Sequence, residues 1–142
     1  MKHYRTIDHT ADIAFEITAG SLEELFETAA EVWLKSTAEI KSFSITTKKE
    51  IALESFSLEN LLVSFISELN YLFLTKKWIA LECEYLKINK HDNKYMLRAV
   101  LNGSDLQSVK VIPKEEIKAV TFHQMNIEKT GTGYRTKIIF DI

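Results

Sequence analysis

The chain has 142 residues and a mass of 16.4 kDa, a length that predicts a single domain over residues 1–142. Hydrophobic residues make up 46% of it and charged residues 27%, which is typical of a globular protein and excludes general disorder. With 18 basic and 20 acidic residues the net charge is −2 and the pI near 6.1, whereas nucleic-acid-binding domains usually have a pI above about 9. We therefore expect no direct nucleic-acid binding, and expect any role in RNA metabolism to act through another protein.

The sequence also predicts where the protein resides. Its N-terminus has no apolar signal region, and no window approaches 18 uninterrupted apolar residues, so we expect a cytoplasmic protein without membrane contact. The lone cysteine, Cys83, excludes an intramolecular disulfide. Because it lies in an apolar alternation, we expect an inert, buried thiol.

The first elements in chain order are a strand and a helix. Apolar residues alternate with others from Asp12 to Thr18, the period of a half-buried strand that leaves Asp12 on the polar side. Ser21 and Glu24 form a capping box, and apolar residues at helical spacing predict a helix to Lys35.

A second helix is the strongest periodic signal of the chain. Residues 43–54 first show strand-like alternation in two pieces. Ser57 can then cap a helix whose apolar stripe runs from Leu58 to Phe73 at positions i, i+3, i+4 and onward. This stripe predicts a helix packed in the core.

Strand patterns fill the remainder. We expect a strand at 79–90 that contains a bulge, then a turn at 91–93 and a returning strand at 95–101. A second turn is expected at 102–104. Residues 117–128 and 133–142 are expected to form a hairpin joined near 130–133. Two helices among some seven strands, the later ones consecutive, predict an α+β fold. We expect two layers: a mixed or largely antiparallel sheet with the two helices on one face.

Standard catalytic motifs are absent from the sequence. It has no Gly-rich phosphate loop, no Cys-x-x-Cys pair and no Gly-x-Ser-x-Gly elbow. Two acidic segments remain, 8–12 at the start and 141–142 at the end. The simple interpretation of the first is a loop in which Asp8 or Thr10 bonds nearby amides.

The C-terminal segment is more informative. Its alternation continues to the last residue, which indicates an end docked in a sheet rather than frayed. The Asp141 side chain and the terminal carboxylate of Ile142 are then held close together and repel unless a cation, basic side chains or amides offset them. Oxygen ligands favour a hard cation such as calcium, magnesium or manganese. The alternative is that Asp141 simply faces water on an outer strand.

The histidines support a weaker hypothesis. His3 and His91 are expected at an exposed terminus and a turn, whereas His9 lies between two potential ligands and His123 lies in a strand. A metal-dependent hydrolase using Asp12, Asp141 and His123 is conceivable, but it lacks a nucleophile or base with an orienting partner.

Several segments, taken in order, resemble the archease family of small acidic proteins that assist RtcB-type RNA ligases in tRNA splicing and RNA repair. The segments that carry the resemblance are Asp8-His9-Thr10-Ala11-Asp12-Ile13, residues 21–30, 61–63 and 68–73, Lys118-Ala119-Val120-Thr121-Phe122-His123, and the terminal Asp141-Ile142. They span essentially the whole chain. Where family members often have Gly-Glu and a later histidine, this chain has Gly103-Ser104 and Val109-Lys110, so roles of those family residues do not transfer.

The resemblance implies a two-layer α+β domain with a divalent-ion site made from Asp12, Asp141 and the carboxylate of Ile142. Calcium is the ion expected in a structure, with Asp8 and His9 as nearby support. It further implies a protein that is not an enzyme but promotes guanylylation and multiple turnover of the ligase. The alternative is a chaperone-like module for a tRNA-modifying enzyme such as a tRNA methyltransferase.

Overall fold

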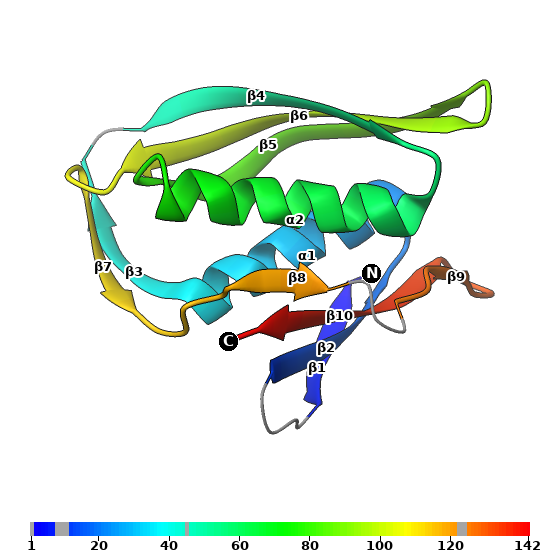
Figure 1. Cartoon of the computed structure of the whole chain (residues 1–142), viewed down its shortest axis with the longest axis horizontal. Helices are drawn as coiled ribbons and strands as arrows, with labels where there is room; N and C mark the ends of the chain where they lie inside the picture. The colour runs from blue at the N-terminus through cyan, green and yellow to red at the C-terminus, as the bar shows by residue number, and fades with distance from the viewer. Residues whose placement is uncertain (1, 8–11, 45, 122–124) are drawn as a thin grey trace.

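The structure is a computed structural model and describes residues 2–7, 12–44, 46–121 and 125–142. Within these residues the chain forms two helices and ten strands (Figure 1). In chain order the elements are β1 (His3–Ile7), β2 (Asp12–Ala19), α1 (Leu22–Thr37), β3 (Ala38–Phe43), β4 (Thr47–Ser55), α2 (Leu58–Leu74), β5 (Trp78–His91), β6 (Lys94–Asp105), β7 (Val109–Pro113), β8 (Ala119–Thr121), β9 (Glu128–Lys129) and β10 (Tyr134–Asp141).

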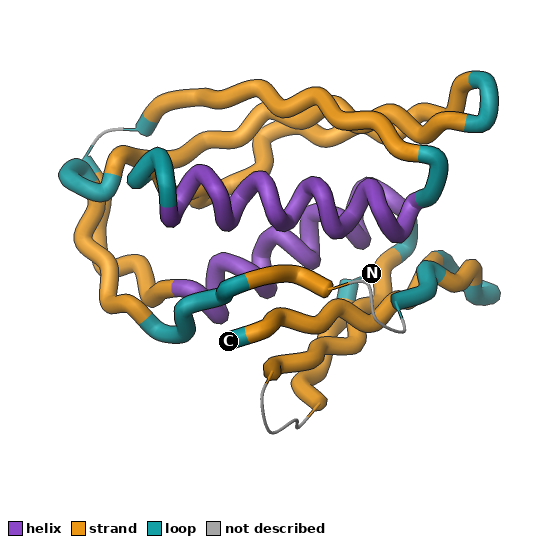
Figure 2. The backbone as a smooth tube through the Cα atoms, viewed as in Figure 1, coloured by secondary structure: helices purple, strands orange, loops and turns teal. Residues whose placement is uncertain are grey.

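The two helices lie between two antiparallel sheets, as Figure 2 shows. One sheet has the order β1-β2-β10-β8, with β9 also paired to β10, and the other has the order β4-β6-β5. Helix α1 contacts β2, β10 and β5, while α2 contacts β8 together with all three strands of the second sheet. The remaining strands, β3 and β7, form a separate pair.

The predicted α+β class with two helices and antiparallel strands is confirmed. The arrangement goes beyond one sheet with helices on a single face, because a second sheet covers the other side of the helix layer. The apolar width of α2 explains this: its buried residues are Leu61, Leu62, Phe65, Ile66, Leu69, Asn70 and Leu72. A stripe this wide has apolar surface for both sheets.

Both helices begin where the sequence predicts. The Ser21 hydroxyl oxygen accepts a hydrogen bond of 3.1 Å from the Glu24 amide, and the Glu24 carboxylate accepts one of 2.8 Å from the Gly20 amide. The Ser57 hydroxyl oxygen likewise accepts one of 3.1 Å from the Asn60 amide. These caps satisfy amide donors that a helix leaves unpaired at its start.

Strands β5 and β6 form a hairpin with a tight turn. Asp92 and Asn93 have φ values of 51° and 66°, as the two central residues of a type I′ turn require, so the predicted turn is confirmed. The predicted bulge is confirmed by a register shift between Cys83 and Tyr85, and a second shift lies between Ala80 and Glu82.

The predicted turn at 102–104 is wrong. Strand β6 continues to Asp105, and Gly103 pairs with Thr47 on one side and with Ala80 on the other. A Cβ atom at Gly103 would overlap the carbonyl oxygen of Ile79 and the indole ring of Trp78. This glycine therefore allows close packing within a strand instead of a chain reversal.

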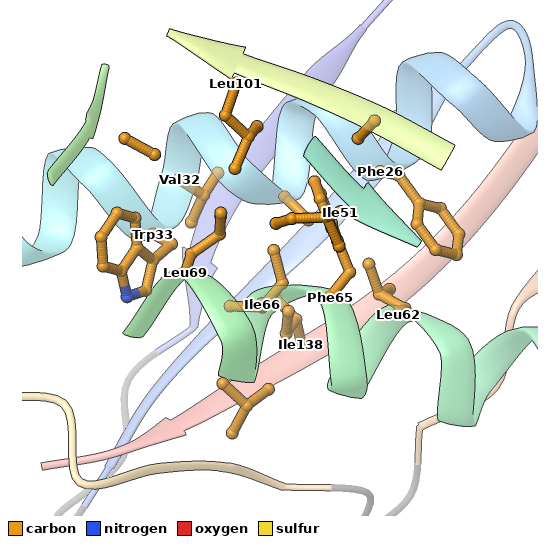
Figure 3. Packing of buried hydrophobic residues seen from close by; sticks show 14 of the residues in the cluster. Phe26, Val32, Trp33, Ile51, Leu62, Phe65, Ile66, Leu69, Leu101 and Ile138 are labelled. Carbon is orange, nitrogen blue, oxygen red and sulfur yellow. The ribbon is translucent and has the colours of Figure 1, made fainter. Parts of the chain in front are cut away.

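Apolar side chains from both helices and both sheets fill the space between the layers. Figure 3 shows Phe26, Val32 and Trp33 of α1, Leu62, Phe65, Ile66 and Leu69 of α2, Ile51 of β4, Leu101 of β6 and Ile138 of β10 gathered in this core. No helix among the described residues is long and apolar enough to cross a membrane.

Candidate functional site

The end of the chain is tied into the middle of the first sheet. Strand β10 pairs with β2 along one side and, near its end, with β8 along the other. The Lys118 amide, just before β8, also donates a hydrogen bond of 2.8 Å to the Asp141 carbonyl oxygen. The predicted docking of the C-terminus is therefore confirmed, because Asp141 is held by backbone pairing on both sides.

This pairing places two carboxylates opposite each other. Asp12, the first residue of β2, is the register partner of Asp141, the last residue of β10. Directly opposite residues of an antiparallel pair project from the same face of the sheet, with Cβ atoms about 4.5–5.5 Å apart. The Oδ1 atom of Asp12 is shielded from solvent. Ile142, the last residue of the sequence, follows Asp141.

The acidic pair lies on the face of the sheet that points away from the helices. Ile13 and Phe15 of β2 pack with the core cluster, and strand alternation places Asp12 on the other face. The next row on that face is Ala14 opposite Ile139, both almost completely buried. The residues directly opposite Asp141 on the two neighbouring strands are Asp12 of β2 and Ala119 of β8. Neither of these two residues is basic.

One basic side chain on this face, that of Arg5, forms an ion pair further along the strands. Glu16 of β2 is opposite Arg5 of β1 and Lys137 of β10, and the Arg5 Nε atom lies 3.2 Å from the Glu16 Oε1 atom. Two rows separate Glu16 from Asp12, roughly 13 Å along a strand. The ion pair between Arg5 and Glu16 is therefore separate from the acidic pair.

The other predicted site residues, Asp8, His9 and His123, lie outside the described residues. In the parts of the chain that are described, no three His, Cys, Asp or Glu side chains form a group able to hold a metal ion. What the structure brings together is the pair of aspartates, Asp12 and Asp141. Oxygen donors of this kind suit a hard cation such as calcium, magnesium or manganese.

One residue that supports the site was not predicted from the sequence. Asn70 of α2 is buried; its Oδ1 atom accepts a hydrogen bond of 3.0 Å from Trp33 Nε1, and its Nδ2 atom donates one of 2.7 Å to the Ile117 carbonyl oxygen. Ile117 precedes Lys118, whose amide bonds to Asp141. The available signal was an amide within the apolar pattern of a core helix, because a buried polar group needs hydrogen-bond partners.

Cys83 is not part of the candidate site. Burial raises the pKa of its thiol to about 11, and its sulfur donates a hydrogen bond of 3.3 Å to the Tyr85 carbonyl oxygen. A neutral thiol is a poor nucleophile, in agreement with the prediction of an inert cysteine, but the side chain is half-buried rather than fully buried as predicted. The thiol borders a hollow of about 360 Å³ between α1 and β5, away from the β2–β10 pair.

Comparison with known proteins identifies a set of similar chains. A model of the archease protein family matches residues 4–142. Protein archease of Methanosarcina barkeri is 38% identical over 142 residues, which cover 99% of this chain and 97% of the relative. Protein archease of Pyrococcus furiosus is 33% identical over 143 residues, with full coverage of both chains.

Two solved structures have the same fold. The solution structure of protein 1598 of Methanobacterium thermoautotrophicum has a TM-score of 0.75 at 24% identity and covers 98% of both chains. The crystal structure of an archease from Thermotoga maritima, described as a possible chaperone, has a TM-score of 0.64 at 27% identity. It covers 97% of this chain and 96% of the other.

Proposed function

The chain belongs to the archease family, and from this membership we propose that it activates an RtcB-type RNA ligase without being an enzyme itself. In this proposal it promotes guanylylation of the ligase and its multiple turnover during tRNA splicing and RNA repair. The observation that carries the proposal is the register of β2 and β10, which sets Asp12 opposite Asp141 at the docked end of the chain.

The donors at this position fit a divalent cation. Asp12, Asp141 and the terminal carboxylate of Ile142 would hold the ion, calcium in the first instance, with magnesium and manganese as alternatives. A cation bound between the two aspartates would have oxygen ligands from both β2 and β10. When bound, the ion would supply positive charge beside a phosphate group, which nucleotidyl transfer requires.

The fold supports this role by fixing the acidic pair. Asp12 and Asp141 are each held by backbone pairing within a sheet, and β8 flanks Asp141 on its second side. A site on paired strands is more rigid than one on loops, so the carboxylates can be presented to a partner with little loss of entropy. The net charge of −2 adds long-range attraction to a basic RNA-binding cleft and so speeds encounter.

The test is a guanylylation assay. Purified ligase is incubated with GTP and manganese, alone or with the wild-type chain, Asp141→Asn or Asp105→Asn. Asp105 is an exposed aspartate at the end of β6 and serves as the matched control. We expect the wild-type chain and the control variant to accelerate guanylylation and Asp141→Asn to lose the effect. Equal rates in all four reactions would refute the proposal.

A second candidate function follows from the description of the Thermotoga maritima relative as a possible chaperone. Under this alternative the chain keeps a tRNA-modifying enzyme, such as a tRNA methyltransferase, soluble or correctly assembled. Light scattering by the heated client would then fall when the chain is added. Asp141→Asn would protect the client as well as the wild type does, which separates this function from ligase activation.

A further inference from the structure

Among the described residues, strand β4 has one long, regular edge that pairs with no other strand. It is an outer strand of the β4-β6-β5 sheet, and its nine residues pair with β6 without a register shift. The opposite edge strand, β5, is interrupted by two register shifts, and β1, at an edge of the other sheet, has only five residues. Proteins commonly protect free edges by bulges, short strands or charged side chains. Strand β4 has neither a bulge nor a short length, and its charged residues carry both signs, so they can attract a complementary strand as well as repel others.

We propose that β4 pairs antiparallel with β4 of a second copy of this chain, with Ile51 at the two-fold axis. This inference is independent of the proposed function, because β4 belongs to the sheet that does not contain the acidic pair. The dimer would join two three-stranded sheets into one continuous sheet of six strands, a closed and self-complementary arrangement.

The charges of β4 select this register. Lys48, Glu50 and Glu54 alternate with the buried Ile51 and therefore project from the outer face of the sheet. With Ile51 opposite Ile51, Lys48 of each copy stands opposite Glu54 of the other. If the two-fold axis lay at Glu50, Glu50 would stand opposite Glu50 of the other copy. If it lay at Ala52, Glu50 would stand opposite Glu54. Like charges directly opposite each other destabilise a strand pair. The pattern thus favours one symmetric pairing and disfavours its two nearest neighbours.

The existing ion pairs of the outer face extend this pattern. Within one chain, Lys48 Nζ lies 2.7 Å from Glu84 Oε1, and Lys94 Nζ lies 3.3 Å from Glu54 Oε1. In the dimer, contact between Lys48 and Glu54 of the two copies would join these pairs end to end. The charges then alternate in sign across the interface, in the order Glu84, Lys48, Glu54, Lys94.

A hollow on the outer face provides a second complementary contact. It has a volume of about 290 Å³ and lies over Ala52, which pairs with Arg98 of β6. Arg98 is exposed and makes no hydrogen bond or ion pair within the described part of the chain. In the proposed register Glu50 of the second copy stands opposite Ala52. Its Cα atom would be two strand spacings, roughly 10 Å, from that of Arg98, a gap that both long side chains can bridge over the small alanine.

The interface is expected to be weak but specific. Pairing of two nine-residue edges is small beside the roughly 1,200–2,000 Å² buried in stable complexes. We therefore expect a dimer that forms at micromolar concentrations, with its register set by the charges more than by buried area.

Sedimentation velocity on the full chain over a concentration series tests the proposal. The variants are Lys48→Glu, Glu54→Lys and the control Lys110→Glu, which reverses an exposed charge on β7, a strand outside this sheet. Each interface variant sets like charges opposite each other twice, so its dissociation constant should rise about tenfold or more. The control should dimerise like the wild type.

Mixing the two interface variants makes the test specific. Lys48→Glu in one copy meets Glu54→Lys in the other, so opposite charges face each other again and a heterodimer should form although neither variant dimerises alone. Circular dichroism on every variant confirms that it is folded. A wild-type chain that stays monomeric throughout, a dimer that tolerates either charge reversal, or a mixture that stays monomeric would each overturn the proposal.

Discussion

Asn70 donates a hydrogen bond of 2.7 Å from its buried side-chain amide to the carbonyl oxygen of Ile117. The same amide accepts from Trp33, so one side chain connects α1, α2 and the segment that enters β8. Because the next residue, Lys118, bonds to the Asp141 backbone, this connection extends to the end of the chain.

Replacement Asn70→Leu should lower the free energy of unfolding by about 2–4 kcal/mol, since Trp33 Nε1 and the Ile117 carbonyl oxygen lose their partner within the core. Urea denaturation measures the change, and Ser67→Leu at an exposed position of α2 serves as the control. Trp33→Phe combined with Asn70→Leu should cost less than the sum of the two single changes. Additive costs would show that the bond between them contributes nothing.

Gly103 gives a second prediction, on the packing of β6. Gly103→Ala should destabilise the fold by about 1–3 kcal/mol, because the added Cβ atom overlaps the Ile79 carbonyl oxygen and the Trp78 ring. Gly131→Ala is the matched control, since a Cβ atom there has no neighbour within 4 Å. Thermal unfolding of both variants measures the difference, and equal melting temperatures would contradict the close packing at Gly103.

The raised pKa of Cys83 predicts slow alkylation. With a thiol pKa of about 11 in place of 9.0, the thiolate fraction at pH 8 falls roughly a hundredfold. Iodoacetamide should therefore react with Cys83 more slowly in the folded chain than in the chain unfolded by urea. The pKa is raised in the folded state, so the stability linked to the neutral thiol is complete below pH 9.0 and is lost as the pH rises to about 11. Cys83→Ala should lose less stability over this range. Equal alkylation rates for the folded and unfolded chains would contradict the burial effect.

Glu31 predicts a small dependence of stability on acid pH. A hydrogen bond of 2.8 Å from Lys2 Nζ lowers the pKa of this carboxyl below 4.5. Lys35 Nζ also lies 3.1 Å from the Glu31 Oε1 atom. The folded-state pKa is lowered, so the associated stability is present above pH 4.5 and is lost as the pH falls through the folded-state pKa. Because these groups are partly exposed, the expected loss is below about 1 kcal/mol. Glu31→Gln should show a shallower fall of stability with acid in urea titrations, and an unchanged slope would contradict the assignment.

Much of the fold follows from local sequence patterns. The two helices, their caps at Ser21 and Ser57, and the docked C-terminal strand were predicted, because caps and apolar periodicity act over a few neighbouring residues. The short strand β1 was not predicted. Its formation depends on pairing with β2, and five residues carry too little pattern of their own.

Tertiary packing decided the features that local patterns missed. Asn102-Gly103-Ser104 has the composition of a turn, yet close approach of Trp78 and Ile79 uses the glycine inside a strand. The candidate site shows the same division. Alternation predicted that Asp141 is docked, and the family resemblance placed Asp12 in the same site, but local patterns could not give the register of β2 and β10 that sets the two residues opposite each other.

We propose that Asp12, Asp141 and the terminal carboxylate of Ile142 together hold a divalent cation. Isothermal titration calorimetry with calcium, and then with magnesium and manganese, tests it on the wild type, Asp12→Asn, Asp141→Asn and a chain with one glycine appended after Ile142. The appended residue moves the terminal carboxylate by about 3.4 Å while keeping both aspartates. We predict one binding site in the wild type and at least about tenfold weaker binding in each of these three altered chains. The control variant Asp105→Asn should bind the ion as tightly as the wild type does. A wild-type chain that binds none of the three ions, or altered chains that bind them as tightly as the wild type, would contradict the account.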